Sequence, residues 1–368
     1  MRFVLHNEIP EDAALGRQWN ALVSQMERPE VFYTYEWALA VSRAYLESIN
    51  PLLMLAYEGS SLFGVAALAV DQTRQQAFFL AGATADYCDF VCLAAQRHEL
   101  VSRVLAELRN QDIPVLVLAN VPADSDTARI VTGAGGHKVF SRPAYKCSQI
   151  QLRSLEQRQS VRNALRPKLR RRYLRAMEVP VRVDHLTSWG EIAPALPGFY
   201  NCHIERFRAT GRISNLACPQ RRAFLAELAK LLSPKGWITL SQLWLAERPI
   251  AWHYGFQFAR HLFYYLPTFD ANFGEYSPGF SLLLQLIDEA CESEETDFVD
   301  LGLGDEGYKK RLATEVRETL HLTSTRSAAA CLRVAARYHA GAAIKNSPRL
   351  EHAVRRLLGL PSTASVQA

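Results

Sequence analysis

The chain repeats one order of predicted helices and strands, and its two copies begin roughly 170 residues apart. The first copy has two helical patterns within 11–47, followed by two strand-like runs around a turn at 58–61. The second copy has two helical patterns within 191–232, followed by two strand-like runs around a turn at 247–249. Because the same order is kept twice over such a distance, the sequence indicates duplicated domains.

Both copies continue in the same way, with a third strand, a helix, a strand, a helix and a closing strand. An antiparallel meander that leads into such a crossover predicts a mixed, twisted sheet with helices on both faces, which is an α/β fold. We therefore divide the chain into an N-terminal domain at 1–152, a basic helical connector at 153–178, a C-terminal domain at 179–325 and a basic helical tail at 326–368.

Length and composition fit this division. With 368 residues, of which 49% are hydrophobic, the chain has enough apolar surface for a core in each domain. The first residues lack the apolar stretch of a secretory signal, and no apolar run approaches the roughly 18 residues of a membrane span. We therefore expect a cytoplasmic protein. The seven cysteines are irregularly spaced, so we interpret them as small core residues and expect no metal site.

The segment after the third strand of the second copy predicts a site for a phosphate-bearing ligand. Ser277 fits the cap of the next helix, Pro278 fits its first position, and Gly279 allows close approach to the backbone. Such a helix start offers unpaired N–H groups and the positive end of a dipole to an anion. The alternative is an ordinary capped helix after a loop. Pro267 interrupts the preceding strand, so we expect free N–H groups near Leu266 to polarise a carbonyl oxygen.

A second informative stretch follows the next predicted strand. Asp300 ends that strand, and three glycines between 302 and 307 make a flexible loop before Tyr308. A phenol at this place can protonate a leaving group, and Lys309 can meet a phosphate or an anionic group of a substrate. The alternative is that Tyr308 only packs and that 309–311 form a solvated face.

Together these motifs resemble those of the CelD/BcsL-like acetyltransferases, a branch of the GNAT superfamily. The matching residues of the second copy are Tyr264, Tyr265, Asp270, Ser277, Pro278, Gly279, Asp297, Asp300, Gly304, Asp305, Glu306, Tyr308 and Lys309. Looser matches are a Trp motif at 35–37, an Asp-Tyr-x-Asp element at 86–89, the basic segment at 166–175 and a helix pattern at 199–206. The glycine-rich form R/Q-x-x-G-x-G/A of GNAT acyltransferases is absent, and the chain departs from the family at Asp300 and in the turn Leu301-Gly302-Leu303.

The resemblance implies two tandem GNAT-like lobes similar to those of the Fem peptidyltransferases, with the second lobe active. It also implies an N-acyltransferase that takes the acyl group from acetyl-CoA or another acyl-CoA. The acceptor would be an amine on a small molecule or on a saccharide, and the reaction would be linked to cellulose, exopolysaccharide or cell-envelope biosynthesis.

Three groups of site residues follow from the motifs and the resemblance. The expected catalytic residues are Tyr308, His253 and Asp300. The expected cofactor-binding residues are Leu266, Ser277, Gly279, Phe280 and Lys309. The expected substrate-binding residues, at the interface of the two lobes, are Asp86, Tyr87, Asp89, His203 and Arg206. For the base that deprotonates the amine, three candidates stay open, namely His253, Asp300 and Glu205. The alternatives are that His203 is a hydrogen-bonded core residue, that Arg206 only forms an ion pair and that Tyr87 packs.

Two other functions compete with acyl-CoA transfer. A Fem-like transferase would use aminoacyl-tRNA, and the basic segment 166–175 would then hold RNA phosphates. A non-catalytic binding module would keep the fold without the chemistry, as the first copy does, since nothing before residue 96 resembles a phosphate loop. For the tail, a helix packed on the second lobe competes with peripheral contact to an anionic membrane. The oligomeric state is not predicted.

Overall fold

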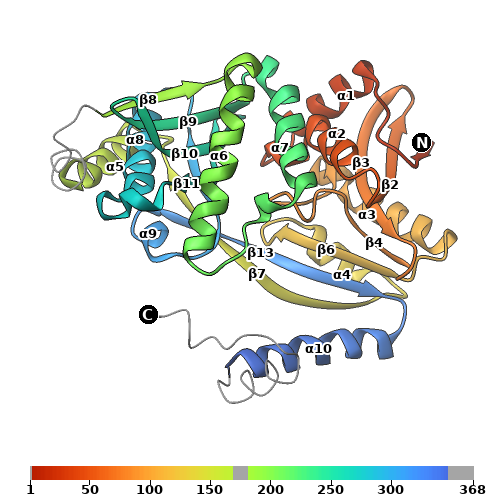
Figure 1. Cartoon of the computed structure of the whole chain (residues 1–368). Coiled ribbons are helices and arrows are strands. Elements are labelled where there is room, and N and C mark those ends of the chain that lie inside the picture. Colours follow the sequence, from red (N-terminus) through yellow and green to blue (C-terminus); the bar gives the residue numbers. More distant parts are fainter. Residues whose placement is uncertain (1, 169–180, 347–368) are drawn as a thin grey trace.

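The computed structural model describes residues 2–168 and 181–346. In this part of the chain the two copies lie side by side and share one 13-stranded mixed sheet with helices on both faces (Figure 1). The strand order is β1-β2-β3-β4-β6-β13-β7-β12-β11-β10-β9-β8, and β5 pairs with β3. The predicted α/β class and the predicted mixed sheet are confirmed.

The first copy runs from β1 to β7. Its elements are β1 (Arg2–His6), α1 (Ala13–Ser24), α2 (Tyr35–Ala44), β2 (Asn50–Glu58), β3 (Ser61–Asp71), β4 (Gln76–Phe79), β5 (Val91–Cys92), α3 (Ala94–Asn110), β6 (Val115–Pro122), α4 (Thr127–Gly133) and β7 (Lys138–Gln151). The sequence patterns located the helices and the hairpin, but they missed β1. This short strand pairs only with β2 at the edge of the sheet, so half of its side chains face solvent and its apolar signal is weak.

The second copy runs from β8 to β13 and repeats the first. Its elements are β8 (Val181–Leu186), α6 (Trp189–Ala209), α7 (Pro219–Leu232), β9 (Ile238–Leu245), β10 (Arg248–Phe258), β11 (His261–Phe269), the 3-10 helix η5 (Ala271–Tyr276), α8 (Pro278–Glu292), β12 (Phe298–Leu303), α9 (Gly307–Lys310) and β13 (Glu315–Thr325). The helix predicted at 305–313 is only the single turn α9. Gly302 and Gly304 adopt positive φ angles of 73° and 109°, so the chain is still turning there and the helix starts late.

The closing strands of the two copies are exchanged. β7, the last strand of the first copy, pairs with β12 of the second, and β13, the last strand of the chain, pairs with β6 of the first. β7 and β13 also pair with each other along most of their length, and in Figure 1 they run side by side beneath the two halves. The two copies are therefore joined by main-chain hydrogen bonds and not by side-chain packing alone.

The sheet opens between β11 and β12. The two strands pair in parallel over three positions only, and the last pair joins Phe263 to Asp300. Beyond it β11 continues to Phe269 alongside β10, while β12 follows β7. An open, unpaired strand edge leaves main-chain groups free for a ligand, so this gap is where a binding site is expected.

Aromatic side chains pack the two copies together across the gap. The ring of Trp37 on α2 lies 5.5 Å from that of Phe224 on α7, and Phe32 lies 5.4 Å from Phe263 on β11. Trp37 is fully buried, which for such a large side chain stabilises the folded state by roughly 2–3 kcal/mol. A second core, between the sheet and α8, is built mainly of leucine, isoleucine and valine.

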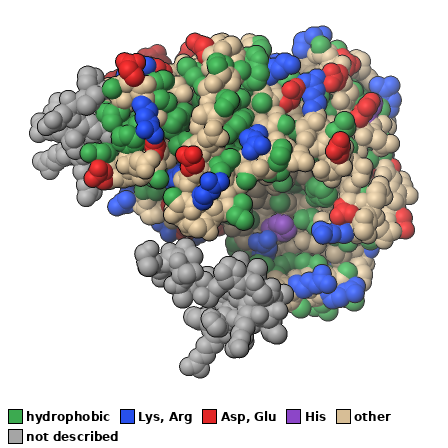
Figure 2. Space-filling view, in the orientation of Figure 1, with side chains coloured by type: hydrophobic (Ala, Val, Ile, Leu, Met, Phe, Trp, Pro, Cys, Tyr) green, Lys and Arg blue, Asp and Glu red, His purple; other side chains and the backbone are tan. Residues whose placement is uncertain are grey.

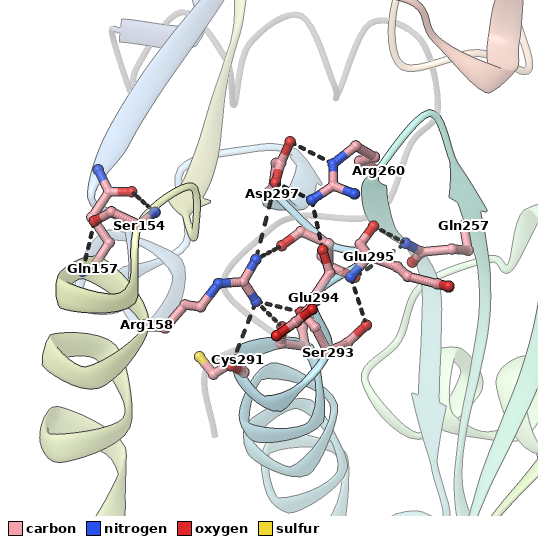
Figure 3. A network of polar contacts seen from close by, with 12 residues as sticks. Ser154, Gln157, Arg158, Gln257, Arg260, Cys291, Ser293, Glu294, Glu295 and Asp297 are labelled. Carbon is pink, nitrogen blue, oxygen red and sulfur yellow. Dashed lines mark hydrogen bonds and ion pairs between the residues drawn. The ribbon is translucent and has the colours of Figure 1, made fainter.

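The connector and the tail each begin with a helix that packs on the sheet domains. In α5 (Leu155–Lys168), Arg158 donates hydrogen bonds to the carbonyls of Ala290 and Thr296 at 3.1 and 2.7 Å, which caps the C-terminal end of α8 (Figure 3). In α10 (Ala328–Asn346), the ring of Tyr338 lies 5.6 Å from that of Phe140 on β7. Most of the basic segment predicted at 166–175, and the tail after residue 346, lie outside the described residues.

Candidate active site

A pocket of about 260 Å³ lies at the free end of β11. It is bounded by β11, η5, the start of α8, α9 and the C-terminal part of α6. We call it the α8 pocket, and its lining residues are Arg206, Tyr264, Pro267, Thr268, Phe269, Gly274, Ser277, Gly279, Phe280, Leu283 and Tyr308. Five of the predicted site residues meet here, namely Arg206, Ser277, Gly279, Phe280 and Tyr308.

The start of α8 has the form that the sequence predicts, except at Ser277. Pro278 is the first helical residue, but Ser277 adopts a left-handed conformation (φ 49°, ψ 50°), and its side chain makes no capping hydrogen bond within the described chain. The helix start is therefore not closed by its own serine, and its dipole end faces the pocket. A Cβ atom added to Gly279 would lie 3.0 Å from the ring of Phe269, so glycine keeps this wall open.

Tyr308 brings a proton donor into the pocket. It lies in the first turn of α9, and its ring meets that of Phe280 edge-on at 6.1 Å. Burial, together with the charge of Glu306, raises the pKa of Tyr308 to about 12. The phenol is therefore protonated at neutral pH, so it can donate a hydrogen bond or a proton to negative charge that develops on a leaving group.

Arg206 contributes a positive charge on the opposite wall. One of its guanidinium nitrogens donates to the carbonyl of Pro267 at 3.3 Å, and the guanidinium lies 4.3 Å from the ring centre of Phe269. Burial lowers the pKa of Arg206 from its usual value, but an arginine keeps its proton in proteins. The side chain thus holds the end of β11 in place and faces any anionic ligand in the pocket.

Asp300 and Tyr87 lie together where the two copies meet. The Tyr87 hydroxyl and the Gln149 amide both donate to one Asp300 oxygen at 2.7 Å, and the backbone N–H of Gly302 donates to the other at 2.7 Å. Burial raises the pKa of Tyr87 well above its usual value, so the phenol stays a donor. Asp300 is buried. Its hydrogen bonds join β12 of the second copy to Gln149 on β7 and to Tyr87, both in the first copy.

His253 lies behind the wall of the pocket. Its ring stacks on Tyr264 at 4.5 Å, and only 1% of the residue is exposed. A Cβ atom on Gly255 would come within 2.0 Å of the imidazole, so this glycine makes the space that the ring occupies. Burial lowers the pKa of His253 to about 3, which leaves the ring neutral. The side chain of Tyr264 separates it from the ligand space.

Four other predicted residues have local partners away from the pocket. Lys309 is buried and donates to the carbonyl of Leu303 at 2.7 Å, with Glu306 3.0 Å away. His203 bonds to the Ser214 hydroxyl at 2.8 Å, and burial lowers its pKa to about 4. Leu266 pairs with Tyr254 on β10. Asp89 lies in the first copy, paired with Arg97 at 2.8 Å.

Asp86 lies at the gap between β11 and β12. A Cβ atom on Gly302 would be 3.0 Å from its carboxylate and 3.2 Å from the Tyr264 carbonyl. Near it are Arg221 of α7, which donates to the Tyr265 hydroxyl at 2.6 Å, and Tyr265, which in turn donates to the Thr84 carbonyl. Sequence reasoning named Asp86 but missed Arg221, whose only signal was its place at the start of a predicted helix.

Two features are absent from the described residues. Among residues 2–168 and 181–346, no group of three or more His, Cys, Asp or Glu side chains is arranged to hold a metal ion. In the same ranges, no helix combines the length and the apolar character that a bilayer crossing requires. Figure 2 shows a hollow between the two halves, below the helices α6 and α7 of Figure 1, lined mainly by hydrophobic side chains.

Residues 159–310 match the family model described as "Acetyltransferase (GNAT) domain". This part of the chain is thus similar to a GNAT-type acetyltransferase domain. The matched region begins in α5 and ends in α9, so it includes the whole α8 pocket. No curated protein sequence matches the chain.

Several solved structures share the fold over most of its length. The crystal structure of FemX is similar with a TM-score of 0.61 and 11% identity, over 88% of this chain and 97% of that one. L-PGS from Bacillus licheniformis has a TM-score of 0.54 and 11% identity, over 88% and 94%. A tandem GNAT protein from the clavulanic acid biosynthesis pathway has a TM-score of 0.51 and 12% identity, over 89% and 98%. At such identities the likeness shows the fold alone, and it confirms the tandem GNAT-like architecture.

Proposed function

We propose that the protein is an N-acyltransferase that moves an acyl group, acetyl in the simplest case, from CoA to an amine. The observation that supports this most is the α8 pocket, which joins an open strand edge, an uncapped helix start and a buried phenol at one place. Each of these features meets a different part of an acyl-CoA. The donor supplies the acyl group as an activated thioester, and the chain supplies the surfaces described below.

The residues of the pocket fit such a donor. The start of α8 at Ser277 and Gly279 suits a pyrophosphate, because helix N-termini bind anions. The apolar wall of Phe269, Phe280 and Leu283 suits the arm that carries the thioester. Backbone N–H groups of β11 near Leu266 would stabilise negative charge on the carbonyl oxygen, and Tyr308 would protonate the thiolate that leaves.

We extend the proposal to the acceptor through the resemblance to CelD/BcsL-like acetyltransferases. On this basis the amine belongs to a small molecule or to a saccharide, and the product enters polysaccharide or envelope biosynthesis. A panel of amino sugars, amino acids and simple primary amines tests this part. If amino sugars are no better than simple amines of the same pKa, the link to saccharides is wrong.

A second candidate is a Fem-like transferase that uses aminoacyl-tRNA, and the likeness to FemX and L-PGS favours it. The described part of α5 argues against a free RNA-binding surface there. Arg158 is bound to the end of α8, and Arg162 pairs with Asp288 at 2.8 Å. Purified protein that carries RNA and ignores CoA would favour this candidate over ours.

A thermal-shift titration with CoA, acetyl-CoA and longer acyl-CoAs tests the donor. A ligand that binds only the native state, at 100 times its dissociation constant, adds about 2.7 kcal/mol of stability. We expect a saturable rise with the wild type and a loss of at least about tenfold in affinity with Gly279→Val, because the added atoms would meet Phe269. Gly341→Val, in an open part of α10, is the control and should bind normally. Normal binding by Gly279→Val would place the donor elsewhere.

A further inference from the structure

Three groups from different parts of the chain converge at the gap between β11 and β12. They are the carboxylate of Asp86 from the first copy, the carbonyl of Tyr264 from β11 and the backbone of Gly302 from β12. Gly302 has a positive φ of 73°, and a Cβ atom there would lie 3.0 Å from the carboxylate and 3.2 Å from the carbonyl, so glycine is what lets the three groups come this close. The side chain of Tyr264 also lines the α8 pocket. The carboxylate thus lies where the open end of β11 meets the first copy.

We propose that Asp86 is the general base of the transfer, and that the acceptor amine enters between the two copies to reach it. The inference rests on the proposed function. It means that the first copy, which lacks a donor site of its own, completes the active site of the second.

The other acids and bases near the site are less suited to this role. Asp300 already accepts three hydrogen bonds, and His253 lies behind Tyr264. Glu205 is exposed on α6, on the wall of a separate pocket. Asp86 is partly exposed, and within the described residues its carboxylate accepts a backbone hydrogen bond at Leu303 but none from a side chain. It is therefore the carboxylate at the gap that can still accept a proton from a substrate.

The charges around Asp86 suit a base that works near neutral pH. Burial and the charge of Asp300 raise its pKa to about 7, while Lys309, Arg221 and the backbone at Leu303 oppose the rise. The remaining titratable neighbours are Tyr265 on β11, Cys88 in the loop after β4 and Cys147 on β7, and burial raises the pKa of each. These three groups are neutral at pH 7. The charge around the gap is therefore set by two acids, Asp86 and Asp300, and two bases, Lys309 and Arg221.

In the proposed transfer, one bond to carbon forms as another breaks. The nitrogen lone pair of the neutral amine forms a bond to the thioester carbon, and the carbon–sulfur bond breaks. Asp86 takes one proton from the attacking nitrogen, and the sulfur takes one proton from Tyr308. After the products leave, water returns a proton to Tyr308 and removes the one on Asp86. An amine and an acyl thioester thus become an amide and a thiol.

The first test is Asp86→Asn, which keeps the shape and removes the basic oxygen. We expect kcat to fall about 100-fold or more, which is the usual contribution of a general base. Donor affinity should be unchanged. We expect kcat of the wild type to fall below about pH 7, and this fall should be absent in Asp86→Asn. Asp184→Asn on the edge strand β8 is the matched control, since it removes the same charge from an exposed pair with Arg182.

A second measurement does not depend on activity. Carboxyl-carbon NMR of protein labelled at aspartate should show one signal that titrates near pH 7, and Asp86→Asn should lack it. Asp86→Glu, which keeps a carboxylate, should retain the acidic limb of the pH profile at reduced kcat. An unchanged kcat and pH profile in Asp86→Asn would overturn the assignment, and so would the absence of such a signal in the wild type. Failure of the wild type to bind any acyl-CoA would instead overturn the proposed function.

Discussion

Each copy of the fold has a pocket at the start of the helix that follows its meander, but the two pockets are lined by different kinds of side chain. In the second copy, the start of α8 and the end of β11 border a pocket lined mainly by aromatic and apolar side chains. In the first copy, the start of α3 and the end of β6 border a pocket of about 350 Å³ lined by charged residues. We call this the α3 pocket, and its charged lining residues are Glu27, Arg28, Asp89, Arg97, Asp124, Asp126 and Arg317.

Most of the charges of the α3 pocket are paired within the protein. Arg97 pairs with Asp89 at 2.8 Å, and Arg317 pairs with Asp124 at 3.2 Å and with Glu30. Asp89 also accepts hydrogen bonds from Ser125 and Thr127 at 2.6 Å each. A site whose charges are already neutralised inside the protein has little left to offer an anionic ligand. The comparison teaches that the fold supplies the place in both copies, and that the side chains decide whether a ligand or an ion pair fills it.

The largest expected effect is on the stability of the first copy. Arg97→Met leaves Asp89 buried without its counter-charge, and breaking such a buried pair costs about 3–5 kcal/mol. Urea unfolding measures the change. Arg129→Met removes an exposed pair with Asp126 on the neighbouring helix and should cost less than about 1 kcal/mol. Donor affinity should not change with Arg97→Met, and a parallel loss of affinity would show that the α3 pocket binds the donor.

The next effect separates the two pockets by activity. Tyr308→Phe removes the proton donor of the α8 pocket, so we expect kcat to fall about 100-fold with donor affinity within twofold of the wild type. Tyr33→Phe removes a hydroxyl from a tyrosine that lines the α3 pocket, and kcat should stay unchanged. Steady-state kinetics with calorimetric binding measures both. Equal losses in the two variants would mean that the pockets do not differ in function.

The smallest effect concerns the pH dependence of stability. Burial raises the pKa of Glu30 from 4.5 to about 7, despite its pair with Arg317. An acid whose pKa is higher in the folded state stabilises that state fully below its unfolded pKa, and this stabilisation is lost as pH rises toward about 7. We therefore expect the free energy of unfolding to fall as pH rises from about 4.5 to 7.

Glu30→Gln should flatten that slope in the same pH range. Asp86 contributes a change of the same sign, because its pKa is raised as well. The single variants and the double variant Glu30→Gln/Asp86→Asn, each unfolded with urea at several pH values, separate the two contributions. A slope that is the same in the wild type and in Glu30→Gln would show that this carboxyl titrates normally in the folded protein.

The sequence predicted most of what depends on local pattern. Apolar spacing located the helices and hairpins of both copies, and the Ser-Pro-Gly stretch and Tyr308 fall on one pocket as expected. The sequence did not predict which distant strands pair with each other. Nothing in the pattern of β7 says that its neighbours are β12 and β13, because a strand with apolar residues can pair with any other.

The same limit explains why the side chains of His253 and Lys309 do not line the α8 pocket. His253 faces the sheet surface that α8 covers, and strand alternation cannot tell a covered face from one that borders a pocket. Lys309 turns back to the carbonyl of Leu303, a contact that depends on the positive φ angles of Gly302 and Gly304. These outcomes follow from tertiary packing, which a local pattern does not contain.

The exchange of β7 and β13 has a consequence for how the protein is made. During synthesis β6 leaves the ribosome early, but its neighbour β13 emerges only near the end of the chain. Until then one edge of the first sheet stays open, and open edges favour wrong pairing with other chains. Pairings between such distant segments also slow folding. A ribosome-bound fragment that stops before residue 315 should therefore depend on chaperones, and cutting the gene between the two copies should yield two insoluble products.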